Sequence, residues 1–206
     1  MTPACRLYLL TPPTLEADFP TRLAEALDAG DVAAVKLSLQ DADPETWRAA
    51  AEALRPVVQD RGVALMLAGD AALAASTACD GVHLAPGDMP VADARKLIGK
   101  LQLGVSCGGS RDAAMNAGEA GADYIGFGPY FAAEDEAPDP ELLPWWIELM
   151  ELPAVAEGAI TAENCGELVR AGAEFLAVDD AVWLHPEGPA AGVRALIAAI
   201  AASQPV

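Results

Sequence analysis

Short hydrophobic runs alternate along the whole chain with segments whose apolar residues recur at helical spacing. Runs of this length are typical of buried strands, and the segments between them are typical of amphipathic helices. The pattern predicts eight strands, near residues 5–11, 33–39, 63–68, 81–84, 101–106, 123–127, 153–157 and 174–179. Strands that alternate regularly with helices favour a parallel sheet, and eight such units predict an α/β fold, the (β/α)8 TIM barrel.

Two of the predicted helices carry the clearest signals. Asp43 and Pro44 form a cap and first-turn pair, after which apolar residues recur at Trp47, Ala51, Leu54 and Val58. Near the end of the chain the same spacing recurs at Val193, Leu196, Ile197 and Ile200. We expect this last helix to close the barrel.

Composition narrows the class of protein. The chain has 206 residues, of which 53% are hydrophobic, enough to bury the core of one barrel domain spanning residues 1–206. The formal net charge of −19 argues against nucleic acid or an anionic membrane surface as a partner, because both require basic patches. The N-terminus lacks an export pattern and the four cysteines are widely spaced, so we expect a cytoplasmic protein with reduced thiols.

A barrel assembles its active site at the carboxyl ends of its strands, so position along each unit predicts which residues could do chemistry. The candidates are Ser38 and Gln40, Gly69 and Asp70, 83–88, 106–110, 128–136, 157–160, and Asp179 with Asp180. Between Arg111 and Arg170 there is no Lys or Arg, while 13 Asp and Glu fall in those 58 residues. Much of this predicted mouth is therefore acidic.

Three segments together resemble the thiamine-phosphate synthase family and its thiazole tautomerase relatives. They read DGVHLAPGDMP at 80–90, LGVSCGGS at 103–110 and AGADYIGFGPYF at 120–131, and the order and spacing fit from Tyr8 to Trp183. The resemblance implies a barrel, often dimeric, that handles small molecules. In the synthase, a pyrimidine methanol diphosphate loses pyrophosphate with the help of Mg²⁺, and a thiazole phosphate is alkylated.

Carried over residue by residue, the resemblance assigns a set of site residues. Ser106, after the fifth strand, matches a family position and is a catalytic candidate, and Asp88 matches a magnesium-binding aspartate. Lys36, inward on the second strand, departs from the family pattern and is a catalytic candidate through its own chemistry, because a buried amine can be reactive. Asp70 stands one position after the residue expected to complete the metal site. The substrate-binding candidates are Tyr8, Ser38, Gln40, His83, Gly128, Gly158 and Ala159.

The chain also departs from the family pattern. Ala68 and Gly69 replace an Asn-Asp pair, residues 133–136 read AEDE where a Thr-x-Thr-Lys is usual, and Pro129 stands where the tautomerases have a histidine. A diphosphate requires cations or metal around it, so these changes predict weak, altered or lost synthase catalysis. The alternative is a non-catalytic ligand-binding or regulatory barrel for a thiamine precursor or another small molecule.

Two candidates have competing interpretations. An inward Lys36 is either a reactive amine or one partner of an ion pair with an inward acid such as Asp70 or Glu157, and the ion pair is favoured. Asp88 is either a metal ligand or a capping residue in the turn before the next helix.

Overall fold

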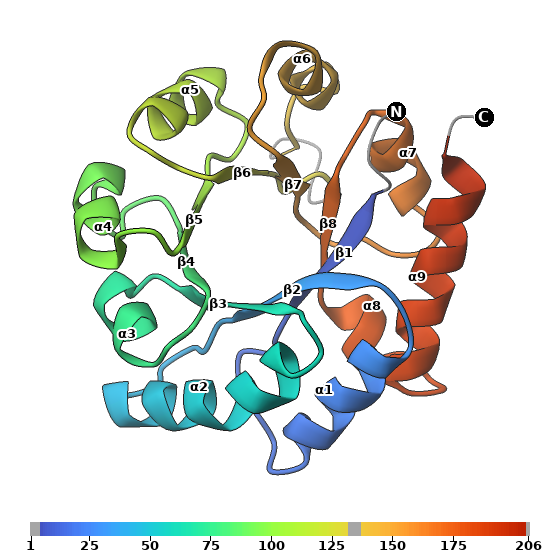
Figure 1. Cartoon of the computed structure of the whole chain (residues 1–206). Coiled ribbons are helices and arrows are strands. Elements are labelled where there is room, and N and C mark those ends of the chain that lie inside the picture. The colour runs from blue at the N-terminus through green and yellow to red at the C-terminus, as the bar shows by residue number, and fades with distance from the viewer. Residues whose placement is uncertain (1–4, 132–136, 205–206) are drawn as a thin grey trace.

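The computed structural model describes residues 5–131 and 137–204, and its eight strands form one closed parallel barrel (Figure 1). Each strand pairs with its neighbour in sequence, and β8 returns to β1. The strands are β1 Arg6–Leu10, β2 Val32–Leu37, β3 Ala64–Ala68, β4 Gly81–Leu84, β5 Gln102–Ser106, β6 Tyr124–Phe127, β7 Ala154–Ala156 and β8 Phe175–Val178. The predicted (β/α)8 fold is confirmed, and every predicted strand lies within two residues of its observed bounds.

The helices cover the outer face of the barrel (Figure 1). They are α1 Phe19–Asp28, α2 Pro44–Gln59, α3 Ala71–Ser76, α4 Val91–Ile98, α5 Arg111–Glu119, α6 Leu142–Leu149, α7 Cys165–Arg170, α8 Asp180–Trp183 and α9 Pro189–Ser203. In α2 the Asp43 carboxylate accepts a hydrogen bond from the Thr46 amide, so the predicted cap is confirmed. The last helix, α9, packs against α1, α7 and α8 and closes the ring of helices.

Buried apolar side chains form two separate clusters, because successive residues of a strand point to opposite faces of the sheet. The larger cluster lies between the barrel and its helices. The smaller one fills the interior of the barrel and centres on Tyr8, Met66, Val155 and Ala177. Among the described residues no helix is long and apolar enough to cross a membrane.

Candidate functional site

Four polar side chains meet inside the barrel near the carboxyl ends of its strands. Lys36 comes from β2, His83 from β4 and Ser106 from the last position of β5, while Glu157 directly follows β7. We call these four residues the mouth cluster. This is the end of a barrel at which catalytic residues usually lie.

The Lys36 ammonium lies 3.6 Å from Glu157 Oε1, with side-chain exposures of 12% and 20%. Of the two partners considered for Lys36, Glu157 is the one the structure shows, so the ion-pair interpretation is confirmed. The same oxygen is buried and accepts no hydrogen bond within the described residues. The ion pair and the missing hydrogen bond agree, because a separation of 3.6 Å between Lys36 Nζ and Glu157 Oε1 permits attraction between charges but is too long for a hydrogen bond. Oε1 therefore keeps an unused acceptor position between Lys36 and His83.

His83 connects the mouth cluster to two tyrosines deeper in the barrel. Its Nε2 lies 2.7 Å from Ser106 Oγ, and its Nδ1 lies 3.0 Å from the Tyr124 hydroxyl. The Tyr124 hydroxyl in turn lies 2.9 Å from the Tyr8 hydroxyl. Together with Glu157, these residues form an unbroken hydrogen-bonded chain along the interior of the barrel.

The protonation state of His83 follows from its surroundings. Burial, and then the positive charge of Lys36, hold the pKa of His83 well below its usual value, so the ring is neutral at pH 7. Nε2 also lies 3.5 Å from Glu157 Oε1, a contact that would favour a charged ring. We give burial the greater weight, because the ring is only 2% exposed.

The donor and the acceptor of each hydrogen bond along this series can then be assigned. The Ser106 hydroxyl donates to Glu157 Oε2 at 3.1 Å, so its oxygen must accept from His83 Nε2–H. A neutral ring protonated on Nε2 accepts at Nδ1, which fixes Tyr124 as the donor there and Tyr8 as the donor to Tyr124. The Ser106 hydroxyl therefore donates to the carboxylate of Glu157 and not to the imidazole of His83.

Two glycines leave space for these hydrogen-bonded side chains. A Cβ on Gly104 would lie on the Tyr124 ring, with its nearest ring atom at 2.1 Å. A Cβ on Gly126 would lie 2.9 Å from Glu157 Oε1 and 3.2 Å from Ser106 Oγ. Since real Cβ atoms do not approach other atoms this closely, both positions require glycine if the chain is to keep its geometry.

The predicted metal residues have structural roles. Asp70 caps α3 by accepting a hydrogen bond from the Leu73 amide at 2.8 Å. Asp88 Oδ2 accepts from the Ala85 amide at 2.7 Å, which closes the loop after β4. No group of three or more His, Cys, Asp or Glu among the described residues could hold a metal ion. However, Mg²⁺ commonly binds one or two carboxylates plus phosphate oxygens of its substrate, and Asp88 Oδ1 is free of hydrogen bonds from the described residues.

Of the remaining substrate-binding candidates, Gly128 and Gly158 lie beside Glu157, whereas Gln40 and Tyr8 lie apart from the mouth cluster. The Ser38 backbone exchanges hydrogen bonds with Thr11 Oγ1, and Gln40 lines a separate surface cavity of about 500 Å³ beside Pro13 and Asp43. Gly128 and Gly158 pack the loops after β6 and β7 against each other. Ala159 has a left-handed backbone with φ of 46°. Tyr8 is 2% exposed and lies two hydrogen bonds below His83, away from the strand ends.

Sequence reasoning did not assign a role in the site to Tyr124, and it considered Glu157 as one of the residues at the strand ends and as a partner for Lys36. The alternation of side chains along a strand could have placed Tyr124 inward together with Gly126. That Glu157 contacts Ser106 as well as Lys36 could not be inferred, because the three residues come from strands far apart in the sequence. The acidic segment at residues 133–136 lies outside the described residues.

A closed (β/α)8 barrel with charged and hydroxyl side chains at the carboxyl ends of its strands has the arrangement in which barrel enzymes carry their active sites. The family model for thiamine monophosphate synthase matches residues 7–182, so the chain belongs to the thiamine monophosphate synthase family. The resemblance inferred from the three motifs is thereby confirmed.

Individual relatives agree with this assignment. The chain is 52% identical over 195 residues to a thiamine-phosphate synthase of Rhodospirillum centenum, covering 92% of this chain and 94% of the relative. It is 42% identical over 207 residues to a thiamine-phosphate synthase of Erythrobacter litoralis, covering 96% of each. A solved thiamine phosphate pyrophosphorylase of Pyrococcus furiosus superposes with a TM-score of 0.87 at 26% identity, covering 97% of each chain. These relatives lend no support to the expectation of weak or lost catalysis.

Proposed function

We propose that the protein couples a pyrimidine methanol diphosphate to a thiazole phosphate, the thiamine-phosphate synthase reaction. The observation that carries the proposal is 52% identity over 92% of the chain to a thiamine-phosphate synthase. In this reaction the bond from the pyrimidine methylene carbon to the diphosphate oxygen breaks and pyrophosphate leaves. The thiazole nitrogen then bonds to the same carbon, so atoms and charge balance.

The mouth cluster supplies groups suited to this chemistry. The Ser106 hydroxyl lies beside Glu157 and His83, where it can contact the pyrimidine or its leaving group. Lys36 is a cation that can move from Glu157 to the diphosphate, because no hydrogen bond ties the two side chains together. Backbone amides after β7, near Gly158 and Ala159, are the groups proposed to bind the thiazole phosphate.

Asp88 is the residue proposed to hold Mg²⁺, with substrate phosphates completing the coordination of the ion. When bound, the ion would neutralise charge that develops on the departing pyrophosphate. Asp70 is the weaker candidate of the two, since its carboxylate already caps α3.

The test is formation of thiamine phosphate from the two phosphorylated substrates with Mg²⁺. In the substrate complex the Ser106 hydroxyl would turn from Glu157 to the leaving group, so the Ser106→Ala variant is expected to lower the rate about 10²-fold, the usual cost of losing one donor to developing charge. Ser76→Ala is the matched control, because Ser76 lies on α3 and bonds only its own helix and Arg48 among the described residues. An inactive wild-type protein would refute the proposed reaction, whereas full activity in Ser106→Ala would refute the role assigned to Ser106.

A second candidate is a ligand-binding barrel without turnover, and the Lys36–Glu157 pair favours it. A lysine already paired with a carboxylate offers little net positive charge to a diphosphate, whereas Glu157 Oε1 can accept from an amine. Calorimetry with thiamine, its phosphates and the free pyrimidine separates the two functions. Tighter binding of the phosphorylated forms would contradict this second candidate.

A further inference from the structure

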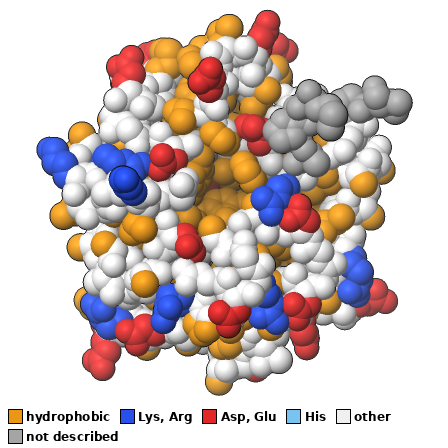
Figure 2. Space-filling view, in the orientation of Figure 1, with side chains coloured by type: hydrophobic (Ala, Val, Ile, Leu, Met, Phe, Trp, Pro, Cys, Tyr) orange, Lys and Arg blue, Asp and Glu red, His pale blue; other side chains and the backbone are white. Residues whose placement is uncertain are grey.

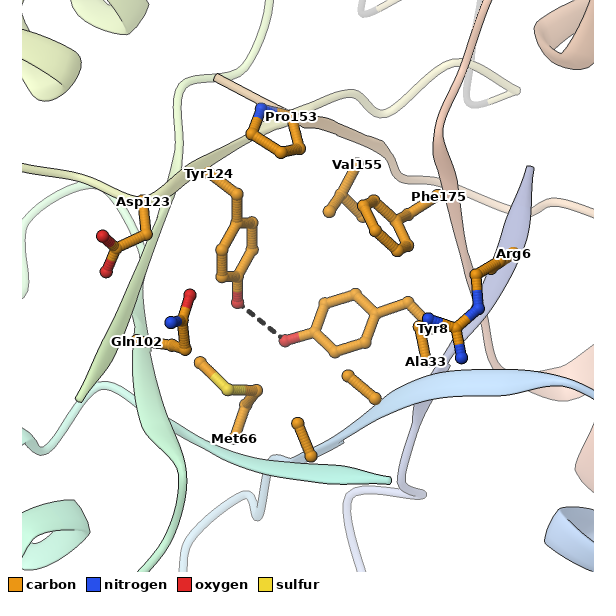
Figure 3. Close-up of a pocket in the computed structure, with 12 residues that line it drawn as sticks. Arg6, Tyr8, Ala33, Met66, Gln102, Asp123, Tyr124, Pro153, Val155 and Phe175 are labelled. Carbon is orange, nitrogen blue, oxygen red and sulfur yellow. Dashed lines mark hydrogen bonds between the residues drawn. The ribbon is translucent and has the colours of Figure 1, made fainter. Parts of the chain in front are cut away.

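A pocket opens at the opposite end of the barrel from the mouth cluster. Its volume is about 270 Å³, and hydrophobic side chains surround it at the centre of the molecule (Figure 2, Figure 3). It is lined by the first residues of β1, β3, β5, β6 and β8, which are Arg6, Ala64, Gln102, Tyr124 and Phe175. We call it the amino-terminal pocket.

Small side chains on two neighbouring strands create the space. The interior of a (β/α)8 barrel is normally filled with layers of bulky branched residues. Here Ala34 on β2 and Ala64 on β3 pair with each other and leave that side of the interior open. Apolar walls come from Met66, Val155 and Phe175, which point toward the centre in Figure 3.

Tyr8 and Tyr124 close the pocket toward the mouth. Their rings meet edge to face with centroids 6.1 Å apart, and their hydroxyls are joined across the centre of the barrel (Figure 3). Burial raises the pKa of both hydroxyls, so both stay protonated and neutral. The amino-terminal pocket is therefore separated from the mouth cluster by a hydrogen-bonded pair of rings.

The charges at the rim already have partners. Arg6 makes two hydrogen bonds to the Asp31 carboxylate, at 2.9 and 2.7 Å. Asp123 accepts from the Arg95 guanidinium and, at 2.8 Å, from the Leu103 amide. Neither group is left to recognise a charged ligand, so the pocket favours a neutral one.

We propose that the amino-terminal pocket binds a small, neutral aromatic molecule of one ring, at a site independent of the mouth cluster. An apolar cavity of about 150 Å³ is enough to hold benzene, so one substituted ring fits here. Aromatic walls from Phe175 and the two tyrosines suit such a ring, because offset and edge-on aromatic pairs are favourable.

Toluene is the probe for the test, and the methyl group of Met66 is the reporter. In protein labelled with ¹³C at its methionine methyl groups, toluene should shift the Met66 resonance upfield in a saturable manner, because an aromatic ring would lie against it. Met89 and Met115 line no part of the pocket and should not respond. Inorganic pyrophosphate and the Ser106→Ala change should leave the Met66 shift intact, whatever the catalytic activity.

Ala64→Leu fills the pocket and should abolish the shift, with Ala34→Leu as a second filling variant. Ala75→Leu is the matched control, since Ala75 is exposed on α3, and it should retain the shift. Dispersed Met89 and Met115 resonances report that each variant is folded. The proposal is overturned by an unresponsive Met66, by equal shifts of all methionines, or by a shift that survives filling of the pocket.

Discussion

The Nε2 atom of His83 lies 2.7 Å from the Oγ of Ser106, and the hydrogen bond runs from the imidazole to the hydroxyl. This direction follows because Ser106 gives its own proton to Glu157. A histidine that donates to a serine cannot also remove the proton of that serine. The pair therefore orients the Ser106 hydroxyl toward Glu157, and any base that acts on Ser106 is Glu157.

His83 should make the stability of the protein depend on pH. Its pKa in the folded protein lies well below the value of about 6.5 expected for an unfolded chain. Below pH 6.5 the unfolded chain therefore binds a proton that the folded protein does not, and the free energy of unfolding falls as the pH drops. The slope approaches about 1.4 kcal/mol per pH unit.

Denaturant titrations between pH 7 and pH 5 measure this slope. His83→Gln should flatten it, whereas His185→Gln, a change outside the barrel interior, should leave it as in the wild type. Carboxylates with lowered pKa values, such as Asp28 and Asp31, lose their contribution only at lower pH, so they do not mask the effect. An equal slope in the wild type and His83→Gln would show that His83 takes up its proton as readily in the folded protein as in the unfolded chain.

The Lys36–Glu157 pair should show measurable coupling in a double-mutant cycle. Because both side chains are largely buried, removing either one leaves an uncompensated charge in the barrel. Lys36→Met, Glu157→Gln and the double variant should give a coupling of about 1–3 kcal/mol in the free energy of unfolding.

The control pair is Lys96 with Asp93, at 2.8 Å on the surface of α4 with side-chain exposures of 76% and 54%. Exposed pairs of this kind contribute only about 0.3–0.5 kcal/mol. A coupling at Lys36–Glu157 no larger than this would mean that water screens the mouth cluster.

The carboxylate of Asp70 should contribute to stability through its cap rather than through metal binding. Asp70→Ala removes the cap of α3 and should cost about 1 kcal/mol in the free energy of unfolding, while Asp70→Asn keeps the hydrogen bond to Leu73 and should cost much less. The Mg²⁺ concentration that gives half-maximal synthase activity should rise in Asp88→Asn and stay unchanged in Asp70→Asn. A rise in both variants would restore Asp70 as a metal ligand.

Gly104 should tolerate no side chain. A methyl group there meets the ring of Tyr124, so Gly104→Ala should destabilise the protein by about 1–3 kcal/mol, as overpacking of a core does. Gly109→Ala is the matched control, because its Cβ would meet only ordinary contacts of 3.5 Å or more, around Pro138. Thermal unfolding of the two variants gives the comparison, and equal midpoints would show that Tyr124 can move aside.

Much of the fold was predictable because its signals are local. The alternation of apolar runs and helical segments identified all eight strands, and Asp43 with Pro44 marked the start of α2. Lys36 could be recognised as inward and in need of an acidic partner, since burial of an unpaired ammonium is costly. The dual interpretation of Asp88 was also sound, because its carboxylate does close a turn.

The rest depended on contacts across the barrel. Asp70 looked like a displaced metal ligand, but the first turn of α3 uses its carboxylate as a cap. Tyr8 matched a position in the mouth, yet it lies deeper, against Tyr124. The many acidic residues suggested lost catalysis, whereas the relatives at 52% and 42% identity are named thiamine-phosphate synthases.

The amino-acid sequence by itself determined the barrel, the Asp43 cap of α2 and the family, because hydrophobic period, capping residues and motifs act over a few neighbouring positions. The tertiary structure alone decided that Glu157 contacts both Lys36 and Ser106, that His83 donates from Nε2, and that a pocket opens at the amino-terminal end. The physical reason is that register and closure set which inward side chains meet across the barrel interior, and residues 23 to 121 positions apart leave no local trace of such a meeting.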